Sequence, residues 1–259
     1  MCRVISIANQ KGGVGKSSSA GSLGVGLARR GKRVLVIDAD SQGSLTESMG
    51  YRNPDEMDTT LTTIMTKIIN EEEIAPGEGI LHHEEGIDIL PCNIELAALE
   101  VAMVNVISRE TVLKRYIDSI KDQYDFCLID CQPSLGIITI NALTAADSVL
   151  IPVLAEYLPA KGLEELIKSI ARVKRQLNPR LQIEGILITM ADYRTNNAKE
   201  VTKAILEKYG AQVKVFEHAV PNSVRAAETP AAGMSIYRYD PKGKVAAAYE
   251  ALTGEVMAG

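Results

Sequence analysis

The sequence predicts a doubly wound α/β fold, in which helices cover both faces of a mainly parallel β-sheet. Short apolar runs of strand character alternate with longer helical stretches along the chain, which is the pattern of successive β-α-β units. The length of 259 residues fits this class, because doubly wound sheets commonly fill this range as one domain. We therefore expect a single domain over residues 1–259.

The expected elements follow one another in a regular order. A first strand at residues 4–8 and a helix at 16–30, which Gly31 ends, lead to a second strand at 33–38. The later strands are expected at residues 87–91, 126–130, 148–153, 183–189 and 213–216, the last of them at a sheet edge. The later helices are expected at residues 95–106, 110–120, 163–177 and 241–257.

Composition and charge are those of an ordinary globular protein, with 46% hydrophobic and 24% charged residues. The net charge of −5 and the pI near 5.4 argue against a protein that coats nucleic acid over its whole surface. Residues 52–86 carry nine acids and two bases, and we expect them to form a peripheral acidic excursion with one apolar segment near 61–69. The rest of the chain has 24 acids and 26 bases, which leaves room for a local basic face.

The cysteines and the apolar runs indicate a cytoplasmic protein. Cys2, Cys92, Cys127 and Cys131 lack the spacing of metal ligands, and we expect reduced core thiols. No signal-peptide pattern opens the sequence, and no apolar run approaches the roughly 18 residues that span a bilayer. The stretch 247–257 is weakly amphipathic but acidic, whereas membrane-surface helices carry lysine and arginine on their polar face.

A glycine-rich loop, N-Q-K-G-G-V-G-K-S-S at residues 9–18, joins the first strand to the first helix. Its glycines permit positive φ, so successive N–H groups can point at one anion. The helix N-terminus that follows also favours negative charge. The loop is therefore predicted to bind phosphates, with Lys16 at the β- and γ-phosphates and the Ser17 hydroxyl on Mg²⁺.

The loop departs from the pattern G-x-x-x-x-G-K-[ST], because Gln10 occupies the place of the first glycine. Its sequence K-G-G-x-G-K-[ST] resembles the deviant Walker A motif of the ATPases that include ParA partition proteins, MinD division-site proteins and the nitrogenase iron protein. The resemblance implies a P-loop NTPase fold, with ATP and Mg²⁺ as cofactors. It also implies that the first lysine, Lys11, crosses a dimer interface to the nucleotide of the partner subunit. The nucleotide contacts implied in the loop are Lys11, Gly12, Gly13, Val14, Gly15, Lys16, Ser17 and Ser18.

Two predicted strands end in carboxylates. The segment D-A-D-S-Q-G at residues 38–43 resembles the D-x-D-P-Q-G of the ParA group, in which the second aspartate, here Asp40, helps to order the attacking water and the magnesium shell. Asp130 ends a hydrophobic strand in the manner of a Walker B acid, which binds Mg²⁺ through a water, and we expect the same role of it. The following residues 131–136 resemble C-P-P-S-L-G with Gln132 in place of a proline. Its amide is expected either to bond near the γ-phosphate or to have no role.

The last third of the chain extends the resemblance to the ParA group. T-M-A-D-Y-R-T-N at residues 189–196 is similar to T-M-x-D-x-R-T-N, V-P-N-S-V-R-A-A-E at 220–228 to I-P-R-N-V-R-L-S-E, and Y-D-P at 239–241 is shared. By this resemblance Arg194 and Arg225 contact DNA without sequence preference, and Pro221 and Asn222 lie on the adenine side of the nucleotide. Asn222 and Ser223 depart from the arginine and asparagine of the family, which puts the adenine contacts in doubt.

The chain is identified as a member of the ParA-type partition ATPases, in the short form without an N-terminal helix-turn-helix. The resemblance implies that ATP closes two subunits face to face, that the dimer binds DNA non-specifically, and that a ParB-like partner stimulates a slow ATPase. The protein would be nucleoid-associated in the cytoplasm and would not bind membranes. The implied catalytic residues are Lys11, Lys16 and Asp40, and the implied metal ligands are Ser17, Asp40 and Asp130.

Three other functions stay open at this point. The first is a MinD-like positioning ATPase at the membrane, which the acidic C-terminal stretch disfavours. The second is an iron–sulfur or reductase-type enzyme of the same loop family, although Cys92 and Cys131 lack the glycine-rich surroundings of the cluster ligands. The third is a phosphoryl-transfer enzyme or synthetase that uses the same loop. The sequence does not reveal the cargo or the partner.

Overall fold

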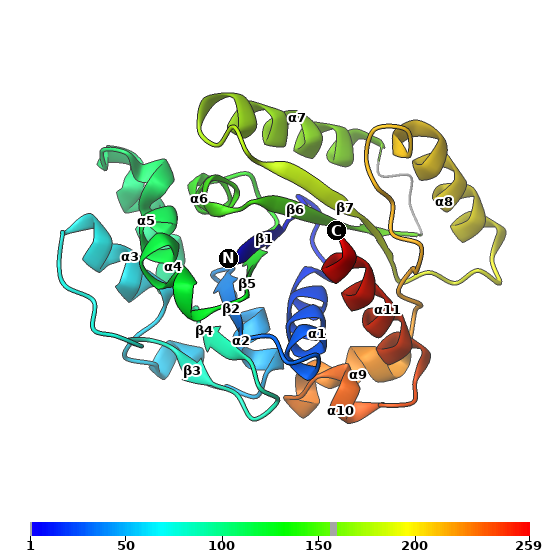
Figure 1. Cartoon of the computed structure of the whole chain (residues 1–259), viewed down its shortest axis with the longest axis horizontal. Coiled ribbons are helices and arrows are strands. Elements are labelled where there is room, and N and C mark those ends of the chain that lie inside the picture. Colours follow the sequence, from blue (N-terminus) through cyan, green and yellow to red (C-terminus); the bar gives the residue numbers. More distant parts are fainter. Residues whose placement is uncertain (1, 156–159) are drawn as a thin grey trace.

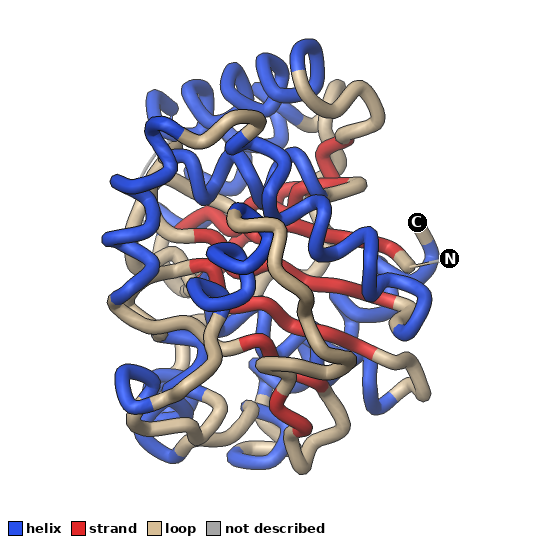
Figure 2. Tube along the Cα trace, turned by 90° about the vertical axis from the view of Figure 1, so that its left-hand side faces the viewer, coloured by secondary structure: helices blue, strands red, loops and turns tan. Residues whose placement is uncertain are grey.

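A seven-stranded sheet forms the centre of the protein, in the order β3-β4-β2-β5-β1-β6-β7. The computed structural model describes residues 2–155 and 160–259. Every neighbouring pair of strands is parallel except β3 and β4. Helices lie on both faces of the sheet (Figure 1), and Figure 2 shows the strands from the side as a twisted layer between them. The predicted fold class is confirmed.

The strands are β1 (Arg3–Ile7), β2 (Val34–Ala39), β3 (Leu81–His82), β4 (Asp88–Leu90), β5 (Phe126–Cys131), β6 (Ser148–Leu154) and β7 (Gln182–Thr189). The longer helices are α1 (Lys16–Arg29), α3 (Leu61–Ile69), α4 (Glu95–Ala102), α5 (Val112–Ile120), α6 (Ile137–Ala145), α7 (Ala160–Gln176), α8 (Asn196–Tyr209), α9 (Val224–Ala232) and α11 (Lys244–Ala258). Two short helices are α2 (Ser44–Ser48) and α10 (Ile236–Tyr239).

The central strands are buried because both faces of the sheet are covered. Every residue of β2 and β5 is buried, which explains their uninterrupted apolar sequences. On one face, α1 and α11 pack together, with Leu23 and Leu252 in one core cluster. On the other face, α3 and α5 to α8 contribute to a second cluster. The sheet therefore separates two apolar layers, and ligands of such folds bind at the ends of the strands.

Two glycines of α1 permit close approach of neighbouring elements. A Cβ at Gly24 would lie 2.7 Å from Val36 Cγ2, so α1 rests directly on β2. A Cβ at Gly26 would lie 2.7 Å from the Tyr237 hydroxyl, so this side of α1 meets the C-terminal helices instead. Close packing on the sheet therefore occurs at Gly24, while Gly26 makes room for α10 and α11.

The strand expected at residues 213–216 is wrong. This segment makes one isolated parallel bridge to β7, between Ile186 and Val215. Two hydrogen bonds form it, from Ile186 N to Lys214 O at 2.8 Å and from Phe216 N to Ile186 O at 3.0 Å. The next acceptor of β7, Ile188 O, receives its hydrogen bond from Val220 N at 2.8 Å and not from His218 N, the donor that a regular parallel ladder would use. The pairing ends because the chain leaves β7 after Phe216 and returns to it only at Val220.

Residues 52–86 contribute more to the core than an excursion would. Their apolar segment forms α3, and Leu61, Ile64 and Met65 are fully buried. Further along, β3 adds an antiparallel edge to β4. The acids near residue 85 bind the C-terminal part of the chain, because Glu85 accepts a hydrogen bond from Ser235 N at 2.9 Å. The description of the whole chain as one domain stays a prediction.

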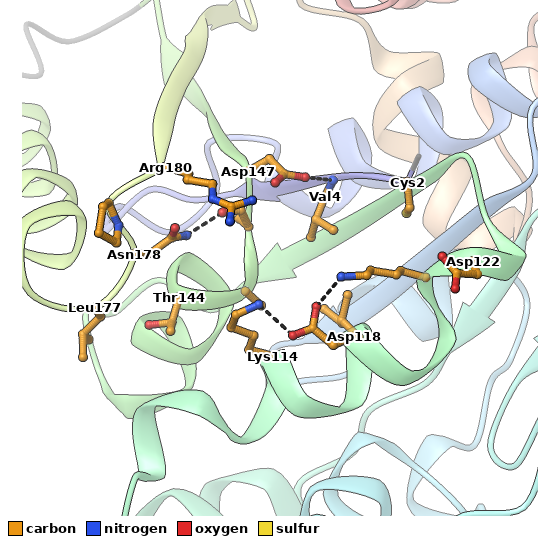
Figure 3. A pocket seen from close by; sticks show the side chains of 15 residues that line it. Cys2, Val4, Lys114, Asp118, Asp122, Thr144, Asp147, Leu177, Asn178 and Arg180 are labelled. Atoms are coloured by element: carbon orange, nitrogen blue, oxygen red, sulfur yellow. Dashed lines mark hydrogen bonds and ion pairs between the residues drawn. The ribbon is translucent and has the colours of Figure 1, made fainter.

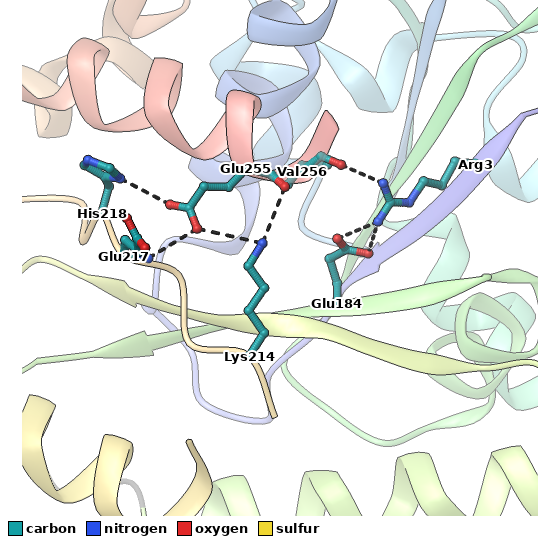
Figure 4. A network of polar contacts seen from close by, with 7 residues as sticks. All are labelled: Arg3, Glu184, Lys214, Glu217, His218, Glu255 and Val256. Carbon is teal, nitrogen blue, oxygen red and sulfur yellow. Dashed lines mark hydrogen bonds and ion pairs between the residues drawn. The ribbon is translucent and has the colours of Figure 1, made fainter. Parts of the chain in front are cut away.

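A polar network fastens the end of α11 to the sheet (Figure 4). The Arg3 guanidinium donates to both carboxylate oxygens of Glu184 and to Val256 O, each at 2.6 Å. Glu255 lies beside it and pairs with Lys214 and His218. The apolar face of α11, with Leu252 and Val256, is buried in the core and is not presented to a membrane. None of the helices within residues 2–155 and 160–259 has the length and apolar character needed to cross a bilayer.

We expect Glu184→Leu to lower the free energy of unfolding by about 2 kcal/mol, because it leaves the Arg3 charge half-buried without its carboxylate. The Ser148 hydroxyl, which donates to Glu184 at 2.7 Å, also loses its acceptor. Urea denaturation measures the effect. The matched control is Glu250→Leu, which breaks the more exposed pair with Arg30 and should cost less than about 1 kcal/mol. Equal losses in the two variants would contradict a supporting role for the buried pair.

Candidate functional site

The glycine-rich loop lies between β1 and the N-terminus of α1, at the carboxyl end of the sheet. Gly13 and Gly15 have φ values of 70° and 82°, a conformation that residues with a Cβ rarely adopt. No acidic residue occupies the first turn of the 14-residue α1. The N–H groups at this helix start therefore face no negative side chain from their own helix, which suits an anion.

Lys16 is buried beneath this loop, with 7% of the residue exposed. Its Nζ donates to Lys11 O at 3.2 Å, which turns the ammonium back into the loop. Burial lowers the pKa of Lys16 below its ordinary value, while the carboxylates of Asp130 and Asp40 oppose this shift. Because burial disfavours the charged form of Lys16, an anion inside the loop would stabilise its ammonium group strongly.

Asn9 is a site residue that the sequence analysis missed. Its Oδ1 accepts from Lys11 N at 3.0 Å, and its Nδ2 donates to Pro152 O at 2.6 Å. The side chain thereby fixes the start of the loop to the end of β6. The signal in the sequence was only a buried polar residue directly after a strand, which does not distinguish this role from a turn.

Two buried carboxylates lie side by side below the loop, because β2 and β5 pair with Asp38 opposite Asp130. Asp38 accepts from the backbone N and the Oγ1 of Thr46 at 2.9 and 2.7 Å. Burial raises the pKa of Asp38 to about 6 despite these bonds. The sequence analysis assigned no role to Asp38, since the pairing of the two strands decides where it lies.

Asp130 has no such support. Neither oxygen of its carboxylate has a hydrogen-bond partner among the residues that the structure describes. Burial first, and then the charge of Asp38, raise its pKa well above the usual range, while the Lys16 ammonium and the Ser17 hydroxyl, which lies near the carboxyl without forming a hydrogen bond of regular geometry, lower it. Unpartnered carboxylate oxygens at the mouth of a phosphate loop are the donors that Mg²⁺ prefers. The residues present thus fit the expected metal.

A pocket of about 530 Å³ opens above these groups and brings Lys16, Ser17 and Asp40 together. Asp40 is half-exposed there, and its Oδ1 accepts from Gln42 N at 3.1 Å. The other residues around the pocket come from the loop, from α2 and α9, and from two strand ends: Gly12, Gly13, Gly15, Ser18, Ser44, Glu47, Ser48, Pro133, Met190, Pro230 and Ala231. Three predicted site residues do not line this pocket: Asp130 and Val14 are buried, and Lys11 is exposed.

The amide of Gln132 is held by α4. Its Nε2 donates to both carboxylate oxygens of Glu100, each at 3.1 Å. The amide nitrogen of Gln132 therefore binds the Glu100 carboxylate and does not donate to the phosphate loop. The sequence left the two expectations for Gln132 open, because it did not reveal that Glu100 lies opposite.

The segments of the last third meet at the end of β7. Ala191 and Pro221 form a parallel bridge, and Asn222 N donates to Ala191 O at 3.2 Å. Neither Pro221 nor Asn222 lines the phosphate pocket, and Pro221 lines a separate hollow of about 410 Å³. The adenine contacts expected of both stay a prediction.

Both predicted DNA arginines are exposed, and each is paired with an acid. The Arg194 side chain is 90% exposed and donates to the two oxygens of Asp192 at 2.8 and 2.7 Å. Arg225 lies 3.7 Å from Asp240. A DNA phosphate would compete with these carboxylates, so the two charges are available only in part.

A second pocket, of about 390 Å³, lies at the opposite end of the sheet, where β1 begins (Figure 3). Several of its charged groups are engaged with one another or with the backbone. Asp118 pairs with Lys114 and Lys121, and Asp147 accepts from Val4 N at 2.8 Å. Ligands of doubly wound sheets bind at the carboxyl ends of the strands, so the candidate site is the phosphate-loop pocket.

Comparison with known proteins decides the family. Residues 2–183 match the AAA domain family. The sporulation initiation inhibitor protein Soj of Bacillus subtilis is 42% identical over 258 residues, covering 100% of this chain and 99% of Soj. The chromosome partitioning protein ParA of Myxococcus xanthus is 40% identical over 257 residues, covering 98% of this chain and 88% of that protein. This chain belongs to the ParA-type partition ATPases.

Solved structures place the ParA-type chain in the same fold. The cobyrinic acid a,c-diamide synthase of Mycobacterium smegmatis, solved with ADP and magnesium, has a TM-score of 0.85 and 32% identity, covering 98% of this chain and 93% of that one. MinD of Pyrococcus horikoshii, complexed with Mg-ADP, has a TM-score of 0.76 and 24% identity, with 100% and 98% covered. The second likeness concerns the fold alone. The family resemblance and the P-loop fold expected from the sequence are confirmed.

The raised pKa of Asp38 predicts how the stability of the folded protein depends on pH. Its folded value of about 6 lies above the roughly 3.9 of an unfolded chain. Between these values the folded protein keeps a proton that the unfolded chain has lost, so stability falls as pH rises from about 4 to about 6. Asp38→Asn cannot lose this proton and should flatten the fall by up to about 1.4 kcal/mol per pH unit.

Urea unfolding of the nucleotide-free protein at several pH values between 4 and 7 measures this slope. The control is Asp58→Asn, which changes an exposed aspartate and should leave the slope unaltered. A slope in Asp38→Asn equal to that of the wild type would show that the Asp38 carboxyl is ionised in the folded protein well below pH 6.

Proposed function

We propose that this ParA-type chain is a Mg²⁺-dependent ATPase that dimerises on ATP, binds DNA without sequence preference and is stimulated by a ParB-like partner. The observation that carries the proposal is the buried Lys16 in a glycine-rich loop, near enough to the carboxylates of Asp130 and Asp40 for both to raise its pKa against the effect of burial. The names of the full-length relatives Soj and ParA support the partition role. Nucleotide and magnesium in the mycobacterial structure support the two cofactors.

Each group of the site has a part in this activity. The loop N–H groups and Lys16 would bind the β- and γ-phosphates, and the Ser17 hydroxyl and the Asp130 carboxylate would hold Mg²⁺. When bound, Mg²⁺ neutralises charge on the phosphates. Asp40, half-exposed at the pocket, would orient the attacking water. Preorganised charge of this kind is the main source of catalysis in phosphoryl transfer.

The dimer and the partner extend this chemistry. Lys11 is exposed outside the lining of the pocket, a position that suits a lysine reaching the nucleotide of a second subunit. An added cation at the transferring phosphoryl group raises the rate of ATP hydrolysis by several orders of magnitude. A chain that receives part of this positive charge from a partner would therefore hydrolyse ATP slowly when it is alone. A ParB-like partner would complete the site. The protein would then act on the nucleoid in the cytoplasm.

DNA binding rests on Arg194 and Arg225. The bridge between Ala191 and Pro221 places the two segments that carry them side by side, which supports a shared binding face. One subunit offers about two phosphate contacts, which is weak at physiological salt, whereas a dimer aligns about four. Binding should therefore depend on ATP.

A synthase is the second candidate, because the mycobacterial structure of 32% identity bears that name. A partition ATPase releases phosphate from ATP without a small-molecule acceptor. A synthase of that kind would need cobyrinic acid and a nitrogen donor such as ammonia, and would form an amide as ATP is cleaved. Product analysis in the presence of ammonium, with and without cobyrinic acid, separates the two functions.

Lys16→Ala should raise the Kd for ATP by more than about 100-fold, because removing the ammonium leaves phosphate charge under-compensated by several kcal/mol. Titration with a fluorescent ATP analogue measures this. The control is Lys32→Ala, which removes a half-buried lysine outside the pocket and should bind as the wild type does. Binding by Lys16→Ala within about threefold of wild type would refute the phosphate-loop assignment.

Duplex DNA should bind with a slope of log affinity against log salt of roughly −3 to −4 in the presence of ATP, at about 0.9 per neutralised phosphate. Arg194→Ala or Arg225→Ala should make the slope shallower by about two units in the dimer. Fluorescence anisotropy at several salt concentrations measures affinity with ATP, with ADP and without nucleotide.

The control for the arginine variants is Arg180→Ala, an exposed arginine at the opposite end of the sheet. It should leave the slope unchanged. Equal affinity in all three nucleotide states would contradict the ATP-dependent dimer, and unchanged slopes in both arginine variants would contradict their contact with DNA.

A further inference from the structure

The end of β7 is bonded to the phosphate loop through one hydroxyl. Thr189 is the last residue of β7 and is 2% exposed. Its Oγ1 lies 2.9 Å from Val14 O in the loop and 3.1 Å from Val153 O in β6. A Cβ at Gly15 would lie 3.9 Å from the Thr189 methyl group, so this side chain also packs against the loop.

The geometry of a phosphate loop explains why this contact matters. N–H groups that converge on an anion require the carbonyls of the same loop to point outward, and a buried carbonyl needs a donor. Val14 is 1% exposed, and the Thr189 hydroxyl supplies a donor to its carbonyl. Without that donor, the carbonyl would be better satisfied if the loop moved toward water.

The residue after Thr189 reinforces this arrangement. Met190 has a φ of 52°, which is unfavourable for a residue with a side chain, and it lines the phosphate pocket. Ala191 then accepts from Asn222 and donates to Val220 O at 3.0 Å. The strand end that anchors the loop is thus itself fixed on its other side.

We propose that Thr189 is a positioning residue that holds the phosphate loop in its nucleotide-binding shape before nucleotide arrives. The inference rests on the proposed function for its consequence, which is tight nucleotide binding. The anchor itself is a property of the nucleotide-free protein, so it can be tested separately.

Three variants test the anchor. Thr189→Val keeps the shape and removes the hydroxyl, and Thr189→Ser keeps the hydroxyl and removes the methyl group. Thr144→Val makes the same chemical change at another buried threonine, whose hydroxyl donates to Ile140 O at 2.7 Å within α6. Hydrogen exchange of peptides covering residues 9–18 is measured in the nucleotide-free protein, followed by the Kd for ATP.

Thr189→Val should speed exchange of the loop amides by about fivefold to tenfold, the effect of losing one buried hydrogen bond, and should weaken ATP binding by a similar factor. Thr189→Ser should stay within about twofold of wild type, and Thr144→Val should leave the loop unchanged. Faster exchange confined to β6 and β7 in Thr189→Val would overturn the proposal, because the hydroxyl would then serve only Val153 O. A wild type that fails to bind ATP would refute the proposed function and leave the exchange result on the anchor standing.

Discussion

The structure depends on charged groups buried together at one end of a parallel sheet. Lys16, Asp38 and Asp130 are withdrawn from water around the phosphate loop, and the carboxylate of Asp130 has no hydrogen-bond partner among the described residues. Burying such groups without full compensation is costly. A magnesium nucleotide would supply an anion for Lys16 and a cation for Asp130, whereas Asp38 already accepts hydrogen bonds from Thr46. The buried charges therefore lower the stability of the nucleotide-free protein and favour the binding of a magnesium nucleotide.

The parallel sheet is what brings these groups together. Because β1, β2 and β5 are neighbours that run in the same direction, the loop after β1 and the two aspartates reach the same edge. Asn9 and Thr189 then fasten the loop to β6 and to β7. The phosphate loop is thus tied to strands on one side while the carboxylates approach from the other, and its shape does not depend on the glycines alone.

Local patterns in the sequence predicted the parts of the fold and site that local chemistry determines. The glycine loop, the strand-terminal aspartates and the strands of the central sheet are of this kind, since each follows from a few consecutive residues. Local patterns do not predict contacts between segments that are far apart in the sequence. Three contacts are of this kind: Asp38 lies opposite Asp130, Gln132 donates to Glu100, and Thr189 donates to the phosphate loop. The strand expected at 213–216 failed for the same reason, because Val220 N, and not His218 N, donates to the next acceptor of β7, Ile188 O.

Helices were missed where motif residues obscured the pattern. The start of α8 is capped by Thr195, which accepts from Ala198 N at 3.3 Å, and α9 contains Pro230. Thr195 lies within the stretch that resembles a family motif, and a proline inside a helix is a signal against that helix. Calorimetric titration of a non-hydrolysable ATP analogue, with Mg²⁺ and with a chelator, tests most directly whether the buried charges await a magnesium nucleotide. The account predicts one nucleotide per chain and at least about tenfold tighter binding with Mg²⁺, since the metal would pair the orphaned carboxylate. Equal affinity with and without Mg²⁺, or no binding, would contradict it.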